Sequence, residues 1–298
     1  MTRLKGLNPD WIDLSKRMPQ TKTDFITRQY LNLPYGDDSL QKMDIYLPEK
    51  GKGPFPVIVN VHGGGFTHCD KHDFHLYPTL FALQQGFAVV AINYRLSPAV
   101  RYPEHYFDVM RAILWIARNC KKFKLDIDNL FLWGTSAGGN LVLQAACKEG
   151  IPLPEDLEAA REIQIRGVAA MCPAIDIPHL GGSGNIVERV GMKLALPILS
   201  KQMFGSFFFP KESVRMSNPT SYIENGIAPV YLQQGTLDPG VPFKQVEAFA
   251  KVLAKILLTK DLVFHVLEGV PHAGATEHFL LPENVNPILR FYTRHMGK

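Results

Sequence analysis

The sequence lacks any run of about twenty apolar residues, the length that a helix needs to cross a bilayer. Its first ten residues hold no apolar segment like that of a secretory signal peptide. Cysteine is scarce: there are four among 298 residues, none with the close spacing of a metal-binding or redox pair. Cys147 and Cys172 lie in apolar runs, which favours buried free thiols. We therefore expect a cytoplasmic location, no membrane association and no disulfide framework.

No segment of the sequence concentrates positive or negative charge. The 32 Lys and Arg residues against 28 Asp and Glu leave a net charge of +4, without a block of five or six like charges. A nucleic-acid-binding protein would carry a basic stripe or a recognisable module, and neither is present. The sequence thus predicts no nucleic-acid partner, and it does not indicate an oligomeric state.

Short apolar runs bounded by Gly, Pro or polar residues dominate the middle of the chain. Such runs are typical of parallel strands that are buried on both faces. They cover residues 57–61, 87–92, 130–133, 168–172, 230–234 and 262–266. Residues 29–33 and 41–47 are expected to add an antiparallel edge.

Helical periodicity separates several of these runs. Apolar residues recur every three or four positions from Pro103 onward, and again over 246–256. Alternating strands and helices imply a mostly parallel sheet flanked by helices. We predict one α/β domain over residues 1–298, with residues 1–26 as an N-terminal extension.

One stretch, from about 178 to 226, breaks this alternation. It contains glycines, a mixed helical piece over 190–204 and the aromatic run 207–209. Because it lies between two predicted strands, we expect a small cap over the carboxyl edge of the sheet. An ordinary surface excursion is the alternative.

The strongest chemical signal is Gly134-Thr-Ser136-Ala-Gly138, between a predicted strand and a predicted helix. A strand, Gly-x-Ser-x-Gly and a helix form a nucleophile elbow, a turn so tight that its flanking residues must be small. The helix N-terminus favours developing negative charge. A phosphate-binding loop is the rival, but its glycine and lysine patterns are missing. Ser136 is therefore the candidate nucleophile.

A second glycine-rich segment, His62-Gly-Gly-Gly65-Phe66, directly follows the strand predicted over 57–61. Glycines let backbone N–H groups approach a ligand closely, and acyl transfer needs such donors at the tetrahedral oxyanion. We predict an oxyanion hole formed by the N–H groups of Gly64, Gly65 and Ala137. A merely flexible loop is the alternative.

A nucleophilic serine needs a base, and the base needs a carboxylate that orients it. When a nucleophile elbow carries the serine, the chain order is serine, acid, histidine. Asp238 follows the strand predicted over 230–234, and His272 follows the last predicted strand. Ser136, Asp238 and His272 are therefore the predicted catalytic triad.

Residues 68–75 contain three histidines, two aspartates and one cysteine, all of them metal-ligand types. Their spacing matches no established zinc motif. We interpret His68, Asp70, His72 and Asp73 as a polar rim of the pocket, with a metal site as the less favoured alternative, and we expect neither metal nor cofactor.

Taken together, these motifs resemble those of the hormone-sensitive-lipase-like carboxylesterases and the neighbouring small bacterial feruloyl and acetyl-xylan esterases. The resemblance runs from about Met43 to Tyr292. It rests on segments 43–48, 62–65, 93–98, 134–139, 238–242, 271–272 and 282–284. It implies the α/β-hydrolase fold and the triad and oxyanion hole named above. The sequence departs at Thr135, where relatives usually carry Asp or Glu, and in its N-terminal stretch, which is not a long two-helix cap.

The resulting prediction is a serine carboxylesterase that hydrolyses short-chain or small soluble esters through an acyl-serine intermediate. Phe66 and Phe204 are expected to contact the substrate, which could be an acetylated sugar or an aryl ester. An amidase, formamidase or peptidase would use the same triad and stays open. A non-catalytic binding protein of this fold would normally lack a triad member.

Overall fold

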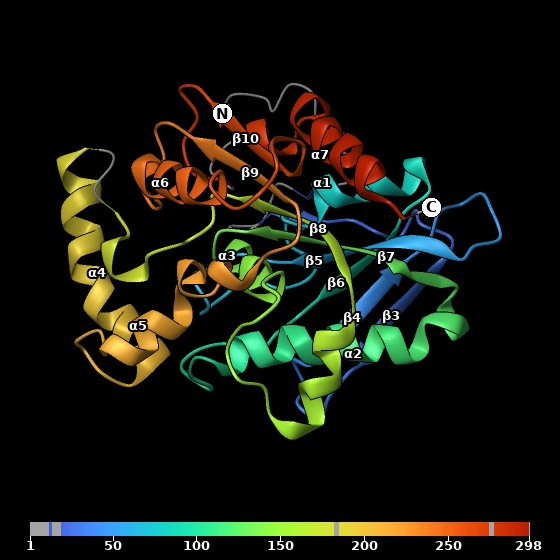
Figure 1. The fold of residues 1–298 in the computed structure, drawn as a ribbon, viewed down its shortest axis with the longest axis horizontal. Helices are drawn as coiled ribbons and strands as arrows, with labels where there is room; N and C mark the ends of the chain where they lie inside the picture. Colours follow the sequence, from blue (N-terminus) through green and yellow to red (C-terminus); the bar gives the residue numbers. More distant parts are fainter. Residues whose placement is uncertain (1–11, 14–18, 182–184, 274–276, 298) are drawn as a thin grey trace.

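The computed structural model describes residues 12–13, 19–181, 185–273 and 277–297 (Figure 1). A sheet of eight strands runs through it in the order β10-β9-β8-β7-β5-β6-β4-β3. The strands are β3 (Gln29–Pro34), β4 (Lys42–Tyr46), β5 (Phe55–Val61), β6 (Ala88–Ile92), β7 (Leu125–Thr135), β8 (Ile165–Met171), β9 (Val230–Gly235) and β10 (Leu262–Leu267). Strands β5 to β10 pair in parallel, whereas β4 pairs antiparallel with both β6 and β3. Both the parallel strands and the antiparallel edge confirm the sequence prediction.

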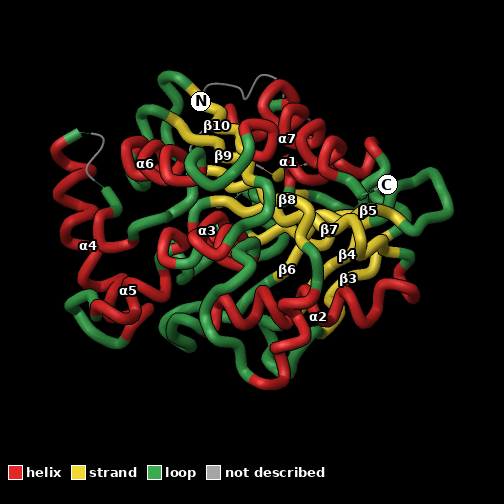
Figure 2. The backbone as a smooth tube through the Cα atoms, in the orientation of Figure 1, coloured by secondary structure: helices red, strands yellow, loops and turns green. Residues whose placement is uncertain are grey.

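Helices cover the sheet on both faces (Figure 2). They are α1 (Tyr77–Leu80), α2 (Glu104–Phe123), α3 (Ala137–Ala145), α4 (Ile186–Phe204), α5 (Lys211–Ser217), α6 (Phe243–Leu253) and α7 (Pro282–His295). Helix α2 begins directly after Pro103, as predicted. Helix α6 ends at Leu253, so Ile256 lies beyond it and is half exposed. Short 3₁₀ turns and the two-residue strands β1 (Ile12–Asp13) and β2 (Gln20–Thr21) complete the described elements.

The core lies in two layers because successive strand residues face opposite sides of the sheet. Val57, Val59 and Val61 of β5 face the cluster that contains α2, α3 and α6. Ile58 faces the second cluster, which contains α1 and α7. Strands buried on both faces must be apolar at every position, which explains their unbroken hydrophobic runs.

Helices α4 and α5 lie between β8 and β9 in the chain, within the stretch that breaks the alternation. In Figure 1 they stand at the left edge of the molecule, away from the sheet. Asn185 begins α4 with a capping box, in which its side chain accepts hydrogen bonds from the N–H groups of Val187 and Glu188. Among the helices described, none is long and apolar enough to cross a membrane.

Candidate active site

Ser136 lies in a sharp turn between β7 and α3. Its backbone has φ 55° and ψ −113°, and its N–H donates to the carbonyl oxygen of Met171 over 2.8 Å. A side chain at Gly134 would place its Cβ 2.3 Å from the Gly138 oxygen, and one at Gly138 would lie 2.1 Å from the Val61 oxygen. Both glycines are therefore required for this turn. The strained backbone conformation is the local feature that a nucleophile elbow needs.

The glycine loop follows β5 and faces the same turn. Gly64 has φ 96° and Gly65 has φ 58°, and a Cβ on Gly64 would lie 2.1 Å from the His68 oxygen. Among the described residues, none accepts a hydrogen bond from the N–H groups of Gly64, Gly65 or Ala137. These three residues and Ser136 line one cavity. Their N–H groups are thus available as donors beside the serine.

Two aromatic side chains brace the glycine loop. The ring of His62 stacks on that of Tyr94 at 4.4 Å, and the Tyr94 hydroxyl lies 3.2 Å and 3.1 Å from the carbonyl oxygens of His62 and Gly63. Burial lowers the pKa of His62, so its imidazole stays neutral. His62 and Tyr94 hold the loop rather than face the cavity.

Asp238 follows β9 and is fully buried. Its Oδ1 accepts hydrogen bonds from the N–H groups of Gly240 and Val241, each over 2.8 Å. Its Oδ2 accepts one from the Gln234 amide over 3.0 Å and lies 2.6 Å from Nδ1 of His272. The carboxylate is therefore held in one orientation toward the imidazole.

His272 follows β10 and reaches the cavity that Ser136 lines. Burial alone would lower its pKa, but the Cys172 sulfur and the hydrogen bond to Asp238 outweigh burial and raise it well above the ordinary value. The Nε2 atom lies 3.9 Å from Sγ of Cys172. No hydrogen bond joins Ser136 to His272 within the described part of the chain, and in unliganded sites such bonds are often long.

The cavity has a volume of about 420 Å³ and two kinds of wall. The sheet edge contributes Ser136, His272, the glycine loop and Phe66. The segment that contains α4 contributes Leu180, Met192 and Leu199. The predicted contact residue Phe66 therefore lies at the cavity.

Phe204, the other predicted contact residue, does not line this cavity. Its ring packs edge-on against those of Tyr102 at 6.3 Å and Phe209 at 6.1 Å. Phe204 thus anchors the end of α4 to the core. Sequence analysis missed Met192 and Leu199 because their direction depends on how α4 is oriented over the sheet.

The polar rim predicted at residues 68–75 is mostly absent. Only His68, Cys69, Phe74 and His75 of this stretch line the cavity. His72 instead lies 2.7 Å from the buried Asp44, beside a buried Lys71. The chain turns at Cys69, which has φ 75°, and this turn directs the following residues inward.

Among the residues that the structure describes, two groups of side chains have the ligand types and spacing to hold a metal ion. One is Cys69, Asp73 and His75, and the other is Cys172, Asp238 and His272. In each group the carboxylate already lies 2.6 Å from an imidazole nitrogen. Burial and Asp73 raise the pKa of the Cys69 thiol, so the thiol is protonated at neutral pH. In both groups the carboxylate and the imidazole are therefore already paired with each other by a hydrogen bond.

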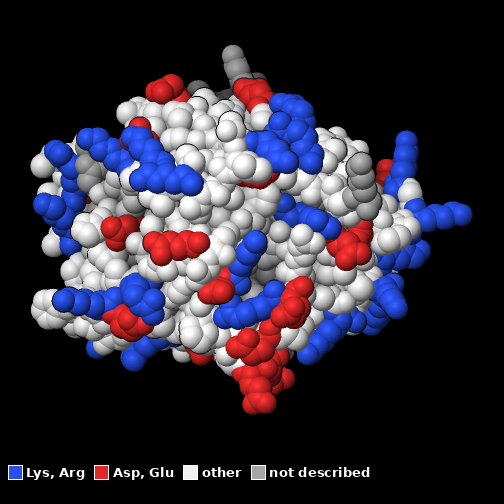
Figure 3. All heavy atoms as spheres, in the orientation of Figure 1, with Lys and Arg blue, Asp and Glu red and all other residues white. Residues whose placement is uncertain are grey.

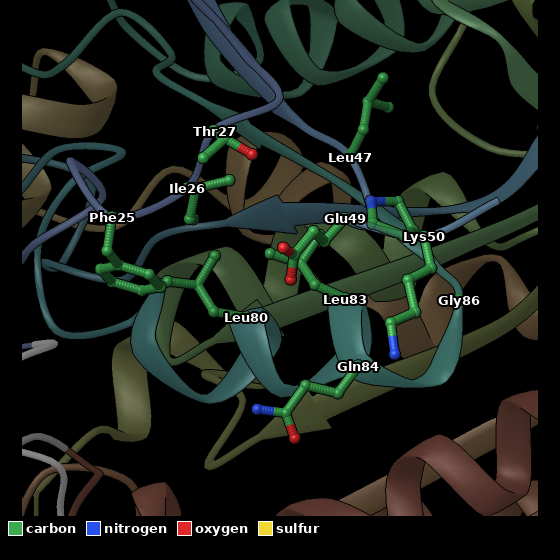
Figure 4. Close-up of a pocket in the computed structure, with 11 residues that line it drawn as sticks. Phe25, Ile26, Thr27, Leu47, Glu49, Lys50, Leu80, Leu83, Gln84 and Gly86 are labelled. Atoms are coloured by element: carbon green, nitrogen blue, oxygen red, sulfur yellow. The ribbon is translucent and has the colours of Figure 1, made fainter. Parts of the chain in front are cut away.

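A second cavity, of about 490 Å³, lies between residues 25–27, the end of β4 and the turn that follows α1 (Figure 4). Leu80, Leu83 and Gln84 line one side of it, and Glu49 and Lys50 line another. It shares no lining residue with the cavity at Ser136. It contains no nucleophile paired with a base, so the candidate site is the cavity at Ser136.

Two supporting residues were not identified from the sequence. Gln234 lies on β9, and its amide binds the Asp238 carboxylate, whereas Cys172 directly follows β8 and lies beside His272. Both lie at or near the carboxyl ends of parallel strands, which meet at one edge of the sheet. That placement was the available signal, but only the structure shows the contacts.

The chain is similar in sequence to known proteins. The chain is 29% identical over 230 residues to Esterase LipQ of Mycobacterium tuberculosis (strain ATCC 25618 / H37Rv), a match covering 76% of this chain and 52% of LipQ. It is 36% identical over 215 residues to a versiconal hemiacetal acetate esterase of Dothistroma septosporum, covering 68% of this chain and 63% of that enzyme. The chain thus spans about half to two-thirds of the length of these curated relatives.

The fold matches solved structures as well. A truncated carbohydrate esterase from gut microbiota superposes with a TM-score of 0.77 over 94% of this chain and all of that chain, at 19% identity. This likeness establishes the α/β-hydrolase fold. The BD-FAE family model matches residues 43–253, more than two-thirds of the chain. The chain therefore belongs to the BD-FAE family.

Proposed function

We propose that the protein is a serine carboxylesterase with Ser136, Asp238 and His272 as its catalytic triad. The observation that carries the proposal is the Asp238–His272 pair, 2.6 Å apart, whose imidazole lines the cavity that Ser136, Gly64, Gly65 and Ala137 also line. The nucleophile, the base and the three backbone N–H groups thus border one space, and the buried Asp238 lies behind the base. The two relatives described above are both named as esterases, which supports the same reaction class.

In the first half of the reaction, His272 Nε2 takes the proton from the Ser136 hydroxyl as Oγ attacks the ester carbonyl carbon. The carbonyl oxygen becomes an oxyanion, which the N–H groups of Gly64, Gly65 and Ala137 stabilise. When the carbon–oxygen bond of the alcohol breaks, His272 donates its proton to the leaving oxygen. The product is an acyl ester of Ser136.

In the second half, water attacks this acyl ester. His272 takes a proton from the water, the same N–H groups bind the new oxyanion, and the proton passes to Ser136 as the acid leaves. Asp238 keeps Nδ1–H of His272 in the correct tautomer and stabilises the imidazolium throughout. The cycle consumes one ester and one water and needs no cofactor.

We propose a small ester with a short acyl group as the substrate. A cavity of about 420 Å³ accommodates a small molecule, and Met192 and Leu199 limit it on one side. We also propose that residues 178–226 act as the cap that shapes the acyl pocket. An acetate ester, or an acetylated sugar, fits this picture, and the two relatives named for an acetate ester and for carbohydrate esters support it.

The test combines an active-site label with a substrate panel. A fluorophosphonate probe is expected to label the protein at Ser136, as located by mass spectrometry, and Ser136→Ala should abolish both labelling and ester hydrolysis. Because the turn tolerates a smaller side chain, this variant should keep the wild-type circular dichroism spectrum. Labelling elsewhere, or hydrolysis above about 1% of wild type, would contradict the assignment.

With nitrophenyl esters, kcat/KM is expected to peak between about C2 and C6 and to fall at least tenfold by about C12. Nitroanilides of the same acids serve as the comparison, because an amidase would hydrolyse them at a similar rate. A maximum at C12 or longer would contradict the proposed short acyl pocket.

A further inference from the structure

Helix α4 and the turn after it carry half of the large apolar side chains that are exposed in the described residues. Seven of the fourteen large apolar side chains that are exposed in the described residues lie within residues 186–208. Val187, Leu194 and Phe208 are 75%, 69% and 85% exposed. Scattered exposed apolar residues are normal, but a contiguous set marks an interaction surface.

These side chains form one face of α4. Val187, Val190, Leu194 and Ile198 follow each other at intervals of three or four residues, which places them on a single side of the helix. We call these four residues, with Phe207 and Phe208, the apolar face. Helix α4 lies at the left edge of Figure 1, away from the central sheet.

The opposite side of α4 is apolar as well. Met192 and Leu199 line the cavity at Ser136, and Met203 is buried in the core. A helix with apolar side chains on two sides is normally covered on both of them. In the described part of the chain, only the inner side of α4 is covered.

Basic residues outnumber acidic ones in the segment that carries the apolar face. Residues 185–211 contain Arg189, Lys193, Lys201 and Lys211 against a single acid, Glu188, which leaves a net charge of +3. Glu188 is engaged in the capping box, where it accepts a hydrogen bond from the N–H of Asn185. In Figure 3, blue Lys and Arg side chains border white surface over this region at the left edge.

We propose that the apolar face of α4 docks on the surface of an anionic lipid bilayer. An amphipathic helix with apolar side chains on one side and Lys or Arg beside them lies in the interface between headgroups and acyl chains. Anionic headgroups attract each nearby cation. A second copy of the chain would instead bring the same set of cations against the first, so the charges favour the bilayer.

Docking would bring the cavity close to the bilayer, because the same helix contributes Met192 and Leu199 to the cavity wall. Binding of the apolar face to a bilayer is a property beyond the proposed esterase activity and does not depend on it. It does not require that the bilayer accelerate the reaction.

The experiment measures co-sedimentation of the full chain, as the Ser136→Ala variant, with large unilamellar vesicles. Vesicles of phosphatidylcholine with about a third phosphatidylglycerol should bind the protein, and vesicles of pure phosphatidylcholine should bind it several-fold less. Binding to the anionic vesicles should weaken as salt rises. Because Ser136 is replaced, a failure of the proposed activity does not affect this measurement.

Two sets of substitutions test the face itself. The double variant Leu194→Ser and Ile198→Ser should lower the partition coefficient at least about tenfold. The double variant Arg189→Glu and Lys193→Glu should remove the preference for anionic vesicles. The matched control is Leu258→Ser, since Leu258 is 64% exposed but lies outside α4, and it should bind like the parent.

Unchanged vesicle binding in the apolar variant would overturn the proposal, as would no binding by the parent. A parent that is a dimer, and that Leu194→Ser converts to a monomer in sedimentation equilibrium, would assign the face to a second copy. Circular dichroism of each variant checks the fold. If the Leu194→Ser and Ile198→Ser double variant is misfolded, the charge-reversed double variant tests the proposal instead. An undiminished preference of that variant for anionic vesicles would then overturn it.

Discussion

Two regions face each other across the cavity, the carboxyl edge of the sheet and helix α4, and the chain holds them very differently. At the sheet edge, Ser136 is bound through its backbone to Met171, and Asp238 accepts four hydrogen bonds. Helix α4 contains Pro197, which lacks a donor N–H, and against the described residues it packs through one side.

In the proposed mechanism, this difference separates the groups that carry out the reaction from those that select the substrate. Groups that transfer protons and stabilise charge must stay within a few tenths of an ångström, so they are placed where the core fixes the backbone. Groups that set the size of the acyl pocket tolerate more movement. Substitutions at the sheet edge should therefore affect rate or folding strongly, whereas those on α4 should alter preference.

The largest effect is expected from Asp238→Asn. We expect kcat/KM to fall about 10³- to 10⁴-fold, because the amide no longer supports the imidazolium or the correct tautomer. Asp261→Asn is the matched control, since Asp261 also lies 3.1 Å from a histidine, His295, but outside the cavity. Nitrophenyl acetate hydrolysis measures both variants.

The pH dependence of kcat/KM tests whether Asp238 acts through His272. Only neutral imidazole can accept the Ser136 proton, so activity is lost as pH falls through the pKa of His272. That pKa is raised above its ordinary value, so the acid limb of kcat/KM should lie above about pH 6.5 in the wild type. In Asp238→Asn it should shift to lower pH. Identical acid limbs in the two proteins would show that Asp238 does not act through His272.

A pair of glycine substitutions compares the regions directly. Gly138→Ala places a Cβ 2.1 Å from the Val61 oxygen, and we expect a loss of at least about 3 kcal/mol in unfolding free energy or no folded protein. Gly191→Ala in α4 meets nothing within 4 Å and should stabilise by about 0.5–1 kcal/mol. Urea denaturation measures both. Equal effects would mean that the two regions are equally constrained.

The smallest effect is expected from Leu199→Ala at the cavity wall. Removing the side chain enlarges the acyl pocket, so the ratio of kcat/KM for C8 over C2 nitrophenyl esters should rise about three- to tenfold. Ile198→Ala is the neighbouring control, because Ile198 faces away from the cavity. A ratio that is unchanged by Leu199→Ala would mean that α4 does not bound the acyl pocket.

The strands and the nucleophile turn were predictable because each is encoded locally. A strand buried on both faces needs an unbroken apolar run, and the turn at Ser136 needs glycine where a Cβ would meet the backbone. The side-chain directions in residues 68–75 were not predictable, because the turn at Cys69 buries His75 and sends His72 to Asp44. The placement of Phe204 against Tyr102 instead of the cavity has a similar cause.

The sequence by itself determined the alternation of strands and helices and the tight turn at Ser136, because these depend on residues close together in the chain. Only the tertiary structure decided that Cys172 lies against His272, that Gln234 orients Asp238, and that α4 covers the cavity with one side while exposing the other. The spacing of apolar residues indicates which side of a helix or strand should be covered. Which segment covers it is settled by packing between parts of the chain far apart in sequence.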